Sequence, residues 1–308
     1  MMEKLISIIV PCYNEQEVIR MTHDRLASLA LNGYRREIIY IDDGSKDDTL
    51  NILYDIAAKD DTVKVLAFSR NFGHQTAVTA GTDAAEGDAL VIIDADLHDP
   101  PEVIPQMLEK WEEGYEVVYG KRTHRDGETA FKKFTAWGYY RFLQAMGGDY
   151  IPKDTGDFRL IDKKVADVLR NDMREHNRFL RGMTAWAGFS QCPVEYERDA
   201  RAAGETKYTL KKMLKLAADG ITAFSSKPLM LPMYLGAAVI PLSLVYLITA
   251  IILAAAGIMN PIHAVLAGVF LLMGMILLFM GIMGLYLARI YDEAKDRPEY
   301  ILKNTERK

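Results

Sequence analysis

The apolar residues of this chain follow two patterns, and the first occupies residues 1–120. There, short runs rich in Val, Ile and Leu alternate with helical stretches. Near-continuous apolar strands are typical of a parallel sheet that is covered on both faces, and strand–helix alternation predicts a doubly wound α/β domain. The expected strands are 5–11, 37–43, 63–69 and 89–96, and the expected helices are 18–31, 49–58 and 75–85.

The second pattern is an uncharged region that runs from Pro228 to Ala288 and contains no Asp, Glu, Lys or Arg. The turn sequence GIMNPIH divides it into two segments, 229–256 and 264–288, each longer than the roughly 20 apolar residues that a helix needs to cross a bilayer. A buried helical hairpin in a soluble core is the alternative. Two adjacent uncharged segments of this length favour a transmembrane hairpin.

The charged residues outside this region indicate its orientation. Lys and Arg lie on both flanks, so the positive-inside rule predicts that both termini and the N-terminal domain are cytoplasmic. No signal peptide is expected, since LISIIV is short and runs directly into Pro11. Cys12 and Cys192 lack metal-ligand spacing and are expected to be reduced thiols. The formal net charge is −5, and we expect no nucleic-acid partner.

Polar residues follow each of the four expected strands. The sequences are PCYNE at 11–15, DDGSKDDT at 42–49, SRNFGHQ at 69–75 and DADLHDPPE at 94–102. In doubly wound sheets, ligands bind at the carboxyl ends of the strands. A single acidic strand end is usually a solvated turn, but four that converge on one edge of a sheet predict a binding site.

Two of these sequences allow more than one interpretation. In DDGSKDDT, Ser45 as a helix N-cap, with Asp47 and Asp48 in the first helical turn, is a structural explanation for those three residues. It leaves out Asp42 and Asp43, which precede the cap and can accept hydrogen bonds from a nucleobase and from ribose hydroxyls.

In DADLHDPPE, the spacing of Asp94 and Asp96 lets both carboxylates reach one hard cation. Mg²⁺ or Mn²⁺ bound in this way also takes oxygens from a substrate phosphate. His98 is either a third ligand or a solvent-exposed turn histidine.

Taken with GDFRL at 156–160, these sequences resemble the motif series of inverting family 2 glycosyltransferases, over essentially the whole chain. The closer resemblance is to the polyprenyl-phosphate branch, which includes dolichol-phosphate mannose synthase and the bactoprenol glucosyltransferases. Two spans after the catalytic domain favour the bactoprenol type. The resemblance implies a glycosyltransferase A fold, Rossmann-like with a mostly parallel sheet, followed by amphipathic interfacial helices and a two-helix transmembrane hairpin.

The resemblance also implies roles for individual residues. The nucleoside would be held by Pro11, Tyr13, Glu15, Asp42 and Asp43, and the metal and sugar diphosphate by Asp94 and Asp96. The family usually has Gln at the position of His98, the candidate third ligand, and this departure bears on which metal is preferred. Asp157 would lie beside the transferred sugar as a base or an orienting carboxylate. Candidates for phosphate contacts are Arg122, Arg159, Arg178, Arg201 and Lys207, of which Arg122 joins Asp96 and Asp157 as a catalytic candidate.

Two further segments are candidates for contact with lipid. Residues 208–224 place apolar residues on one helical face and lysines on the other, which indicates an interfacial helix or a core-facing one. In residues 131–146, core packing and membrane contact are equally compatible with the pattern. The expected organisation is a catalytic domain at 1–206, a juxtamembrane helix at 207–227, two transmembrane helices at 228–290 and a cytoplasmic tail at 291–308.

The expected activity is inverting transfer of a hexose to a polyprenyl phosphate at the cytoplasmic face of a bacterial inner membrane. Glucose from UDP-glucose and undecaprenyl phosphate are the favoured substrates, with a divalent cation as cofactor. The same reaction with GDP-mannose, UDP-N-acetylglucosamine or a modified pentose is an alternative, and so is a non-catalytic flippase subunit. The hairpin also allows homo-oligomer contacts.

Overall fold

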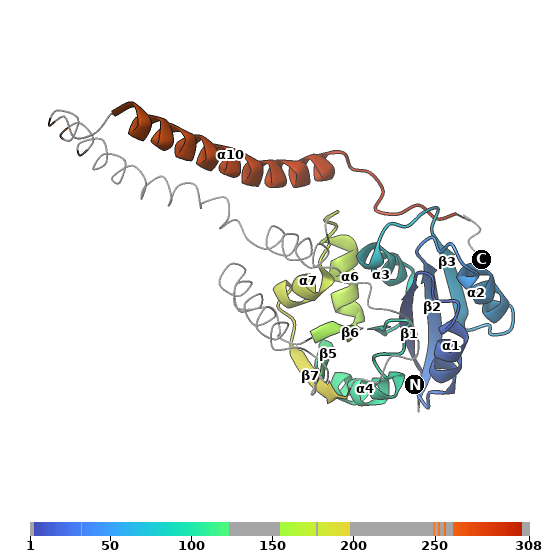
Figure 1. Ribbon diagram of the computed structural model, residues 1–308. Coiled ribbons are helices and arrows are strands. Elements are labelled where there is room, and N and C mark those ends of the chain that lie inside the picture. The colour runs from blue at the N-terminus through green and yellow to red at the C-terminus, as the bar shows by residue number, and fades with distance from the viewer. Residues whose placement is uncertain are drawn as a thin grey trace. The chain divides into compact units, whose positions relative to one another are not determined.

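The computed structural model describes residues 3–31, 33–122, 155–176, 178–197 and 261–303, together with residues 249, 252 and 256 (Figure 1). The chain divides into two compact units. One comprises residues 1–214 and 298–308, and the other comprises residues 215–297. The first unit contains all seven strands of the described residues and is the unit that carries the candidate site.

A seven-stranded sheet with the strand order β3-β2-β1-β4-β6-β5-β7 forms the centre of the first unit. Only β6 runs antiparallel to its neighbours, β4 and β5; the other pairs in the sheet are parallel. The predicted α/β fold with a mostly parallel sheet is therefore confirmed. The strands are β1 (Lys4–Cys12), β2 (Tyr34–Asp42), β3 (Val63–Ala67), β4 (Ala89–Ile92), β5 (Val117–Arg122), β6 (Thr155–Asp162) and β7 (Gln191–Tyr196).

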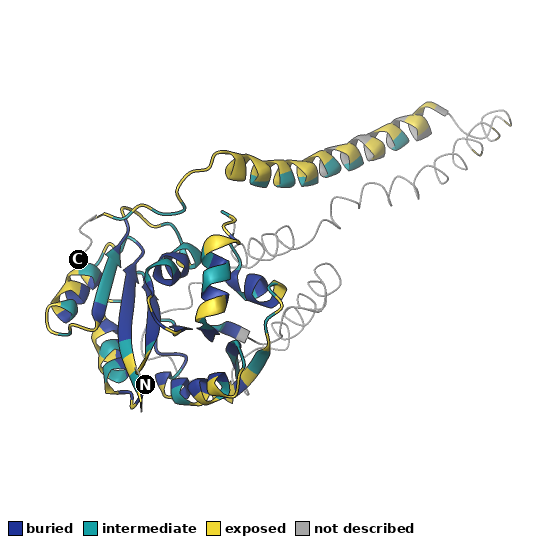
Figure 2. Cartoon of the chain, turned by 180° about the vertical axis from the view of Figure 1, so that it is seen from behind, coloured by how far each residue is buried: buried dark blue, intermediate teal, exposed yellow. Residues whose placement is uncertain are grey.

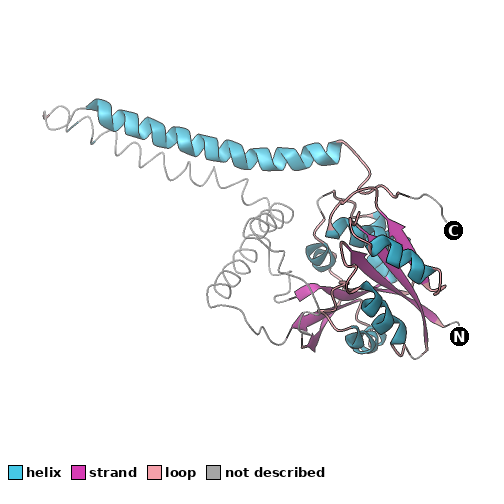
Figure 3. Ribbon diagram, turned by 45° about the vertical axis from the view of Figure 1, so that its right-hand side comes forward, coloured by secondary structure: helices cyan, strands magenta, loops and turns pink. Residues whose placement is uncertain are grey.

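Helices cover both faces of this sheet (Figure 3). The apolar cluster on one face joins residues of β1 and β2 to residues of α1, α2 and α4, while α3 packs on the other face of β1 and β2 and contacts α6. The helices of this unit are α1 (Ile19–Ser28), α2 (Thr49–Ala57), α3 (His74–Ala84), the 3₁₀ turn η1 (Pro101–Val103), α4 (Ile104–Glu112), α6 (Lys163–Asn171) and α7 (Leu180–Trp186).

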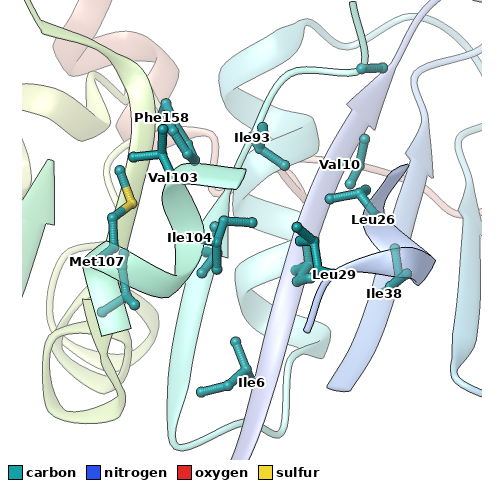
Figure 4. Packing of buried hydrophobic residues seen from close by; sticks show 14 of the residues in the cluster. Ile6, Val10, Leu26, Leu29, Ile38, Ile93, Val103, Ile104, Met107 and Phe158 are labelled. Atoms are coloured by element: carbon teal, nitrogen blue, oxygen red, sulfur yellow. The ribbon is translucent and has the colours of Figure 1, made fainter. Parts of the chain in front are cut away.

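β1, β2 and β4 are buried on both faces over most of their length, which is why their sequences contain nearly continuous runs of apolar residues. Successive side chains of a strand point to opposite faces. In β1, Ile6 and Ile8 enter the cluster that contains Leu26 of α1, whereas Ile9 faces α3; all are fully buried. Figure 4 labels Ile6 and Leu26 within this cluster, and Figure 2 colours the chain by burial. Each such side chain contributes about 1.5–3 kcal/mol through its removal from water.

Of the two interpretations of DDGSKDDT, the one in which Ser45 is the N-cap of the second helix is wrong. α2 begins at Thr49, and the residue at the N-cap position is Asp48, whose side chain makes no capping hydrogen bond. The Asp47 carboxylate accepts from the backbone N–H of Thr49 at 3.1 Å. Ser45 is engaged elsewhere, because its Oγ accepts a hydrogen bond of 3.0 Å from the backbone N–H of Asn14. Ser45 therefore joins the loop after β2 to the loop after β1.

The described part of the second unit is mainly one helix, α10 (Pro261–Ala294), which contains the second predicted apolar segment. Among the described residues, no helix combines the length and the apolar character needed to cross a membrane. The first predicted segment, 229–256, lies outside the described residues except at 249, 252 and 256, and residues 131–146 and 208–224 lie outside them entirely. The transmembrane hairpin and the interfacial helices stay predictions.

Gly44, in the loop after β2, provides a test of how closely the strand-end loops approach one another. Its φ is +67°, and a Cβ atom at this position would lie 2.5 Å from the backbone carbon of Arg70. We expect Gly44→Ala to lower the free energy of unfolding by about 2–4 kcal/mol, since the left-handed conformation and the backbone clash both oppose the methyl group.

Gly33→Ala is the matched control, because Gly33 has a φ of +82° with nothing within 4 Å of the added Cβ. It should cost only about 1 kcal/mol. Urea unfolding of the purified protein measures both values, and equal losses in the two variants would contradict the close approach of the loops.

Candidate functional site

The carboxyl ends of β1, β2 and β3 are held together by hydrogen bonds between their loops. The carboxylate of Asp43, directly after β2, accepts from the backbone N–H of Phe72 at 2.7 Å, from Gly73 at 3.0 Å and from the Asn71 amide at 2.8 Å. The Asn14 side chain in turn accepts from the backbone N–H of Lys46 at 2.8 Å. The three loops therefore form one connected edge.

Asp42 and Asp43 are both buried, with 1% and 3% of their surface exposed. Burial raises the pKa of each, and the hydrogen bonds from backbone N–H groups partly offset this. Asp42 accepts from the backbone N–H of Ser45 at 3.2 Å. Both carboxylates shape the loops from inside the fold, and a contact with a nucleoside stays a prediction for them.

A cluster of four charged side chains lies beside these loops and joins β4, β6, α3 and α7. Arg181 donates two hydrogen bonds to Asp157, from Nε to Oδ1 at 2.7 Å and from Nη2 to Oδ2 at 3.0 Å. His74 Nε2 lies 3.3 Å from Asp157 Oδ2 and 3.7 Å from Asp94 Oδ1. His74 therefore lies between the carboxylate that follows β4 and the carboxylate of β6.

The ionisation of this cluster follows from its contacts. Burial alone would raise the pKa of Asp157, but Arg181 and His74 hold it well below its usual range. Burial alone would lower the pKa of His74, but the hydrogen bond to Asp157 and the charges of Asp94 and Asp157 raise it to about 9. Burial raises the pKa of Asp94 to about 6, against the opposing effect of His74. Near neutral pH, His74 is an imidazolium and Asp157 is a carboxylate.

Asp96 and His98 lie in the turn that follows β4. The backbone N–H of His98 donates to Asp96 Oδ1 at 3.1 Å, and His98 Nε2 lies 3.7 Å from Asp96 Oδ2. Leu97 between them adopts a left-handed φ of +56°. His98 is only 7% exposed, so its interpretation as a solvent-exposed turn histidine is wrong.

Asp94 and Asp96 are suited to bind a divalent cation whose other ligands come from a substrate. No group of three His, Cys, Asp or Glu side chains within the described ranges is arranged to hold a metal ion by itself. The side chains of Asp94 and Asp96 are 35% and 30% exposed, so both can be reached from solvent. Mg²⁺ is commonly bound by one or two carboxylates together with substrate phosphate oxygens, and these two aspartates supply that donor set.

The other predicted residues fall into three groups. Pro11 is buried in β1, while Tyr13 and Glu15 are half-buried in the loop after it. Arg122 ends β5 and pairs with Tyr196 of β7, and its side chain is outside the described residues, as are Arg201 and Lys207 entirely.

Arg159 and Arg178, the third group, make contacts inside the domain, and a phosphate contact stays a prediction for both. Arg159 is buried and donates to Thr184 Oγ1 at 2.6 Å and to the Gly156 carbonyl at 3.1 Å. Arg178 is buried against Glu299 at 3.1 Å. Both guanidinium groups brace the interior of the domain.

Sequence reasoning assigned no role to His74 or to Arg181. The sequence contains a signal for His74, since it belongs to SRNFGHQ and so directly follows an expected strand. It contains none for Arg181, which reaches Asp157 from α7, 24 residues further along the chain.

Comparison with known proteins identifies the family of this chain. Residues 7–170 match the family described as Glycosyl transferase family 2. An uncharacterized glycosyltransferase of Bacillus subtilis, YkcC, is 50% identical, with 97% of this chain and 93% of the relative covered. The bactoprenol glucosyl transferase of Shigella phage SfV is 38% identical, with 98% of this chain and 99% of the relative covered.

A solved structure, glucosyl-3-phosphoglycerate synthase from Mycobacterium tuberculosis, gives a TM-score of 0.49 at 20% identity over 71% of this chain and 76% of that one. This likeness is too slight to carry over a ligand or an activity. The match to the family and the two near full-length relatives are sufficient for the assignment: the chain is a glycosyltransferase that belongs to glycosyl transferase family 2 and is similar over nearly its whole length to the bactoprenol glucosyl transferases.

Proposed function

We propose that the protein transfers a hexose from a sugar nucleotide to a polyprenyl phosphate, with inversion at the anomeric carbon. The favoured substrates are UDP-glucose and undecaprenyl phosphate. The observation that carries this proposal is the cluster of Asp94, His74, Asp157 and Arg181 beside the strand-end loops, in a chain whose near full-length relatives include bactoprenol glucosyl transferases.

The acceptor brings its own nucleophile to this reaction. A phosphate monoester has a second pKa of about 6, so near neutral pH it is largely a dianion. One of its oxygens forms a bond to the anomeric carbon, and the bond between that carbon and the nucleoside diphosphate breaks. No proton has to be removed from the dianion, so a strong general base is not required.

Asp157 is suited to orienting a substrate and poorly suited to taking a proton. A good general base has a pKa near the working pH, and the pKa of Asp157 is held well below its usual range despite burial, through Arg181 and His74. Its two oxygens are already fixed by these neighbours. We assign Asp157 the role of a fixed carboxylate that orients the sugar.

The leaving group is a diphosphate, and its developing charge needs positive charge nearby. Asp94 and Asp96 would hold a divalent cation together with the diphosphate, and His98 is the candidate third ligand. Bound there, the cation would neutralise the leaving group. We propose Mg²⁺ or Mn²⁺ on the chemistry of these donors.

The setting of the reaction is proposed from the sequence. The uncharged region 228–288 and its basic flanks support an integral protein of a bacterial inner membrane with both termini in the cytoplasm. A catalytic domain on that side has access to cytosolic sugar nucleotide and to lipid acceptor in the same leaflet.

The experiment that tests the function uses the purified full-length protein, undecaprenyl phosphate and a panel of sugar nucleotides that contains UDP-glucose, GDP-mannose and UDP-N-acetylglucosamine. We expect a lipid that carries one hexose, identified by mass spectrometry, with UDP-glucose the best donor. Turnover with another donor would change the sugar and keep the reaction. Binding of donor and lipid without turnover would contradict the proposal and favour a flippase subunit.

Asp96→Asn tests the site at the end of β4. The amide keeps the size of the side chain and removes the negative charge that would bind the cation, so the transfer rate should fall by at least about 10²-fold while the protein stays folded. Asp61→Asn is the control, because Asp61 is exposed and precedes β3, at the amino end of that strand and not at the carboxyl end that leads to the site. A normal transfer rate in Asp96→Asn would rule out the assignment.

His74→Gln tests the charged cluster in the metal-free protein. The pKa of His74, about 9 in the fold, lies above its unfolded value of about 6.5. Its interactions therefore stabilise the fold fully below about pH 6.5 and are lost as the pH rises through about 9. With 41% of the side chain exposed, solvent screens the interaction, and we expect a contribution of about 1 kcal/mol.

The measurement is urea unfolding at a series of pH values. The stability advantage of the wild type over His74→Gln should disappear between these two limits. His23→Gln is the contrast, because burial lowers the pKa of His23 and so its contribution should not change over the same range. An advantage of constant size would contradict a charged His74.

A further inference from the structure

The chain that follows α10 forms a short segment, residues 299–303, which we call the C-terminal latch. It belongs to the same compact unit as the sheet. Leu302 pairs antiparallel with Phe68, the Ser69 N–H donates to the Ile301 carbonyl at 2.9 Å, and the Lys303 N–H donates to the Ala67 carbonyl at 2.7 Å. β3 is an edge strand, so the latch pairs with the exposed edge at the point where β3 ends.

Tyr300 connects the latch to the loop that follows β3. Its ring stacks on Phe68 with 5.3 Å between centroids and 18° between planes, and Phe68 in turn packs edge-on against Phe72 at 5.5 Å. Its hydroxyl donates to Asp83 of α3 at 3.1 Å. The backbone N–H of Phe72 is one of the donors to Asp43, so the latch lies directly behind the loop that Asp43 fixes.

Glu299 connects the latch to the segment before α7. Its carboxylate lies 3.1 Å from Arg178 Nε and 3.2 Å from Arg174 Nε, with the Glu299 side chain only 10% exposed. Two residues after Arg178, the Leu180 N–H donates to Gln75 Oε1 at 3.1 Å. The residue after Leu180 is Arg181, which donates to the Asp157 carboxylate.

Tyr300 and Glu299 therefore contact the two segments that supply the charged cluster. The segment after β3 supplies His74, and the segment before α7 leads to Arg181. We propose that Glu299 and Tyr300 are positioning residues for glycosyl transfer, and that the site has its working geometry only when the C-terminal latch is docked. For its kinetic consequences this inference rests on the proposed function.

A purely structural role for the latch makes a different prediction from a positioning role. A segment that only protects the edge of β3 would affect the global stability, and the folded fraction would keep its turnover. A segment that positions the site would alter the loop after β3 and the turnover of protein that remains folded. Displacements of about 1 Å at a reacting centre are enough to cost about 10²-fold in rate.

The test uses Tyr300→Ala and Glu299→Gln in the full-length protein, with Tyr300→Phe and Glu109→Gln as matched controls. Tyr300→Phe keeps the stacked ring and loses only the hydroxyl, and Glu109 is an exposed residue of α4. The first measurement is amide hydrogen exchange at Phe72 and Gly73, well below the unfolding temperature. The second is kcat and KM for the donor on the same folded samples.

For Tyr300→Ala we expect exchange at both amides to be at least about tenfold faster and kcat/KM to fall by about ten- to 100-fold. Glu299→Gln should lower kcat through Arg178 and Arg181, with a smaller change at the two amides. Both control variants should remain within about threefold of the wild type. Unchanged exchange and unchanged kinetics in folded Tyr300→Ala and Glu299→Gln would overturn the inference.

The exchange measurement needs no substrate, which separates this inference from the proposed function. Faster exchange in a protein that transfers no sugar to undecaprenyl phosphate would support the latch and contradict the function. Sugar transfer with normal exchange and normal kinetics in both variants would support the proposed function and contradict the positioning role of the latch.

Discussion

The ion pair between Asp157 and Arg181, extended by His74 to Asp94, is the interaction on which the candidate site depends. These contacts join β6, α7, α3 and the turn after β4, which are distant in sequence. The Asp157 carboxylate is contacted by both a guanidinium and an imidazolium group. The Arg181 and Asp157 side chains are 28% and 13% exposed, so removing one of them leaves the other as a partly buried charge without this partner. The cluster therefore fixes the ionisation of its members and the relative position of β4, β6, α3 and α7.

Asp43, a buried carboxylate, has a comparable role where β1, β2 and β3 end. Asp43 is held by three donors from the loop after β3, and Asn14 and Ser45 connect the loops after β1 and β2. The acidic strand ends thus have two uses. The buried Asp42 and Asp43 hold the loops at the edge of the site in place. Asp94 and Asp96 are partly exposed and can therefore contact a cation or a substrate. A preorganised frame of this kind limits the rearrangement needed when a charged donor arrives.

Much of the fold follows from local sequence. The runs of Val, Ile and Leu can be placed as buried parallel strands because both faces of each strand are apolar, and β1 to β4 and α1 to α3 occur where that pattern puts them. The convergence of the four polar strand ends follows from the parallel arrangement alone. These features depend on residues close together in the chain.

The remainder depends on contacts that local sequence does not encode. Ser45 is an ordinary N-cap residue, and only its hydrogen bond to Asn14 removes it from that role. The hydrogen bonds that Arg159 donates to Thr184 and to the Gly156 carbonyl are likewise not evident from local sequence. Arg181 reaches Asp157 only because β6 inserts antiparallel beside β4. Glu299 and Tyr300, near the end of the chain, are more than 100 residues from Arg178 and from Phe68.

In the proposed reaction the acceptor phosphate, rather than a protein base, supplies the nucleophile while Asp157 stays ionised. This can be tested by comparing the pH dependence of kcat/KM for polyprenyl phosphate with that for the corresponding thiophosphate, whose second pKa is lower. If the acceptor supplies the nucleophile, the acid limb of the profile moves to lower pH with the thiophosphate. An acid limb at the same pH for both acceptors would show that a protein group controls the step and would rule out the acceptor as the titrating group.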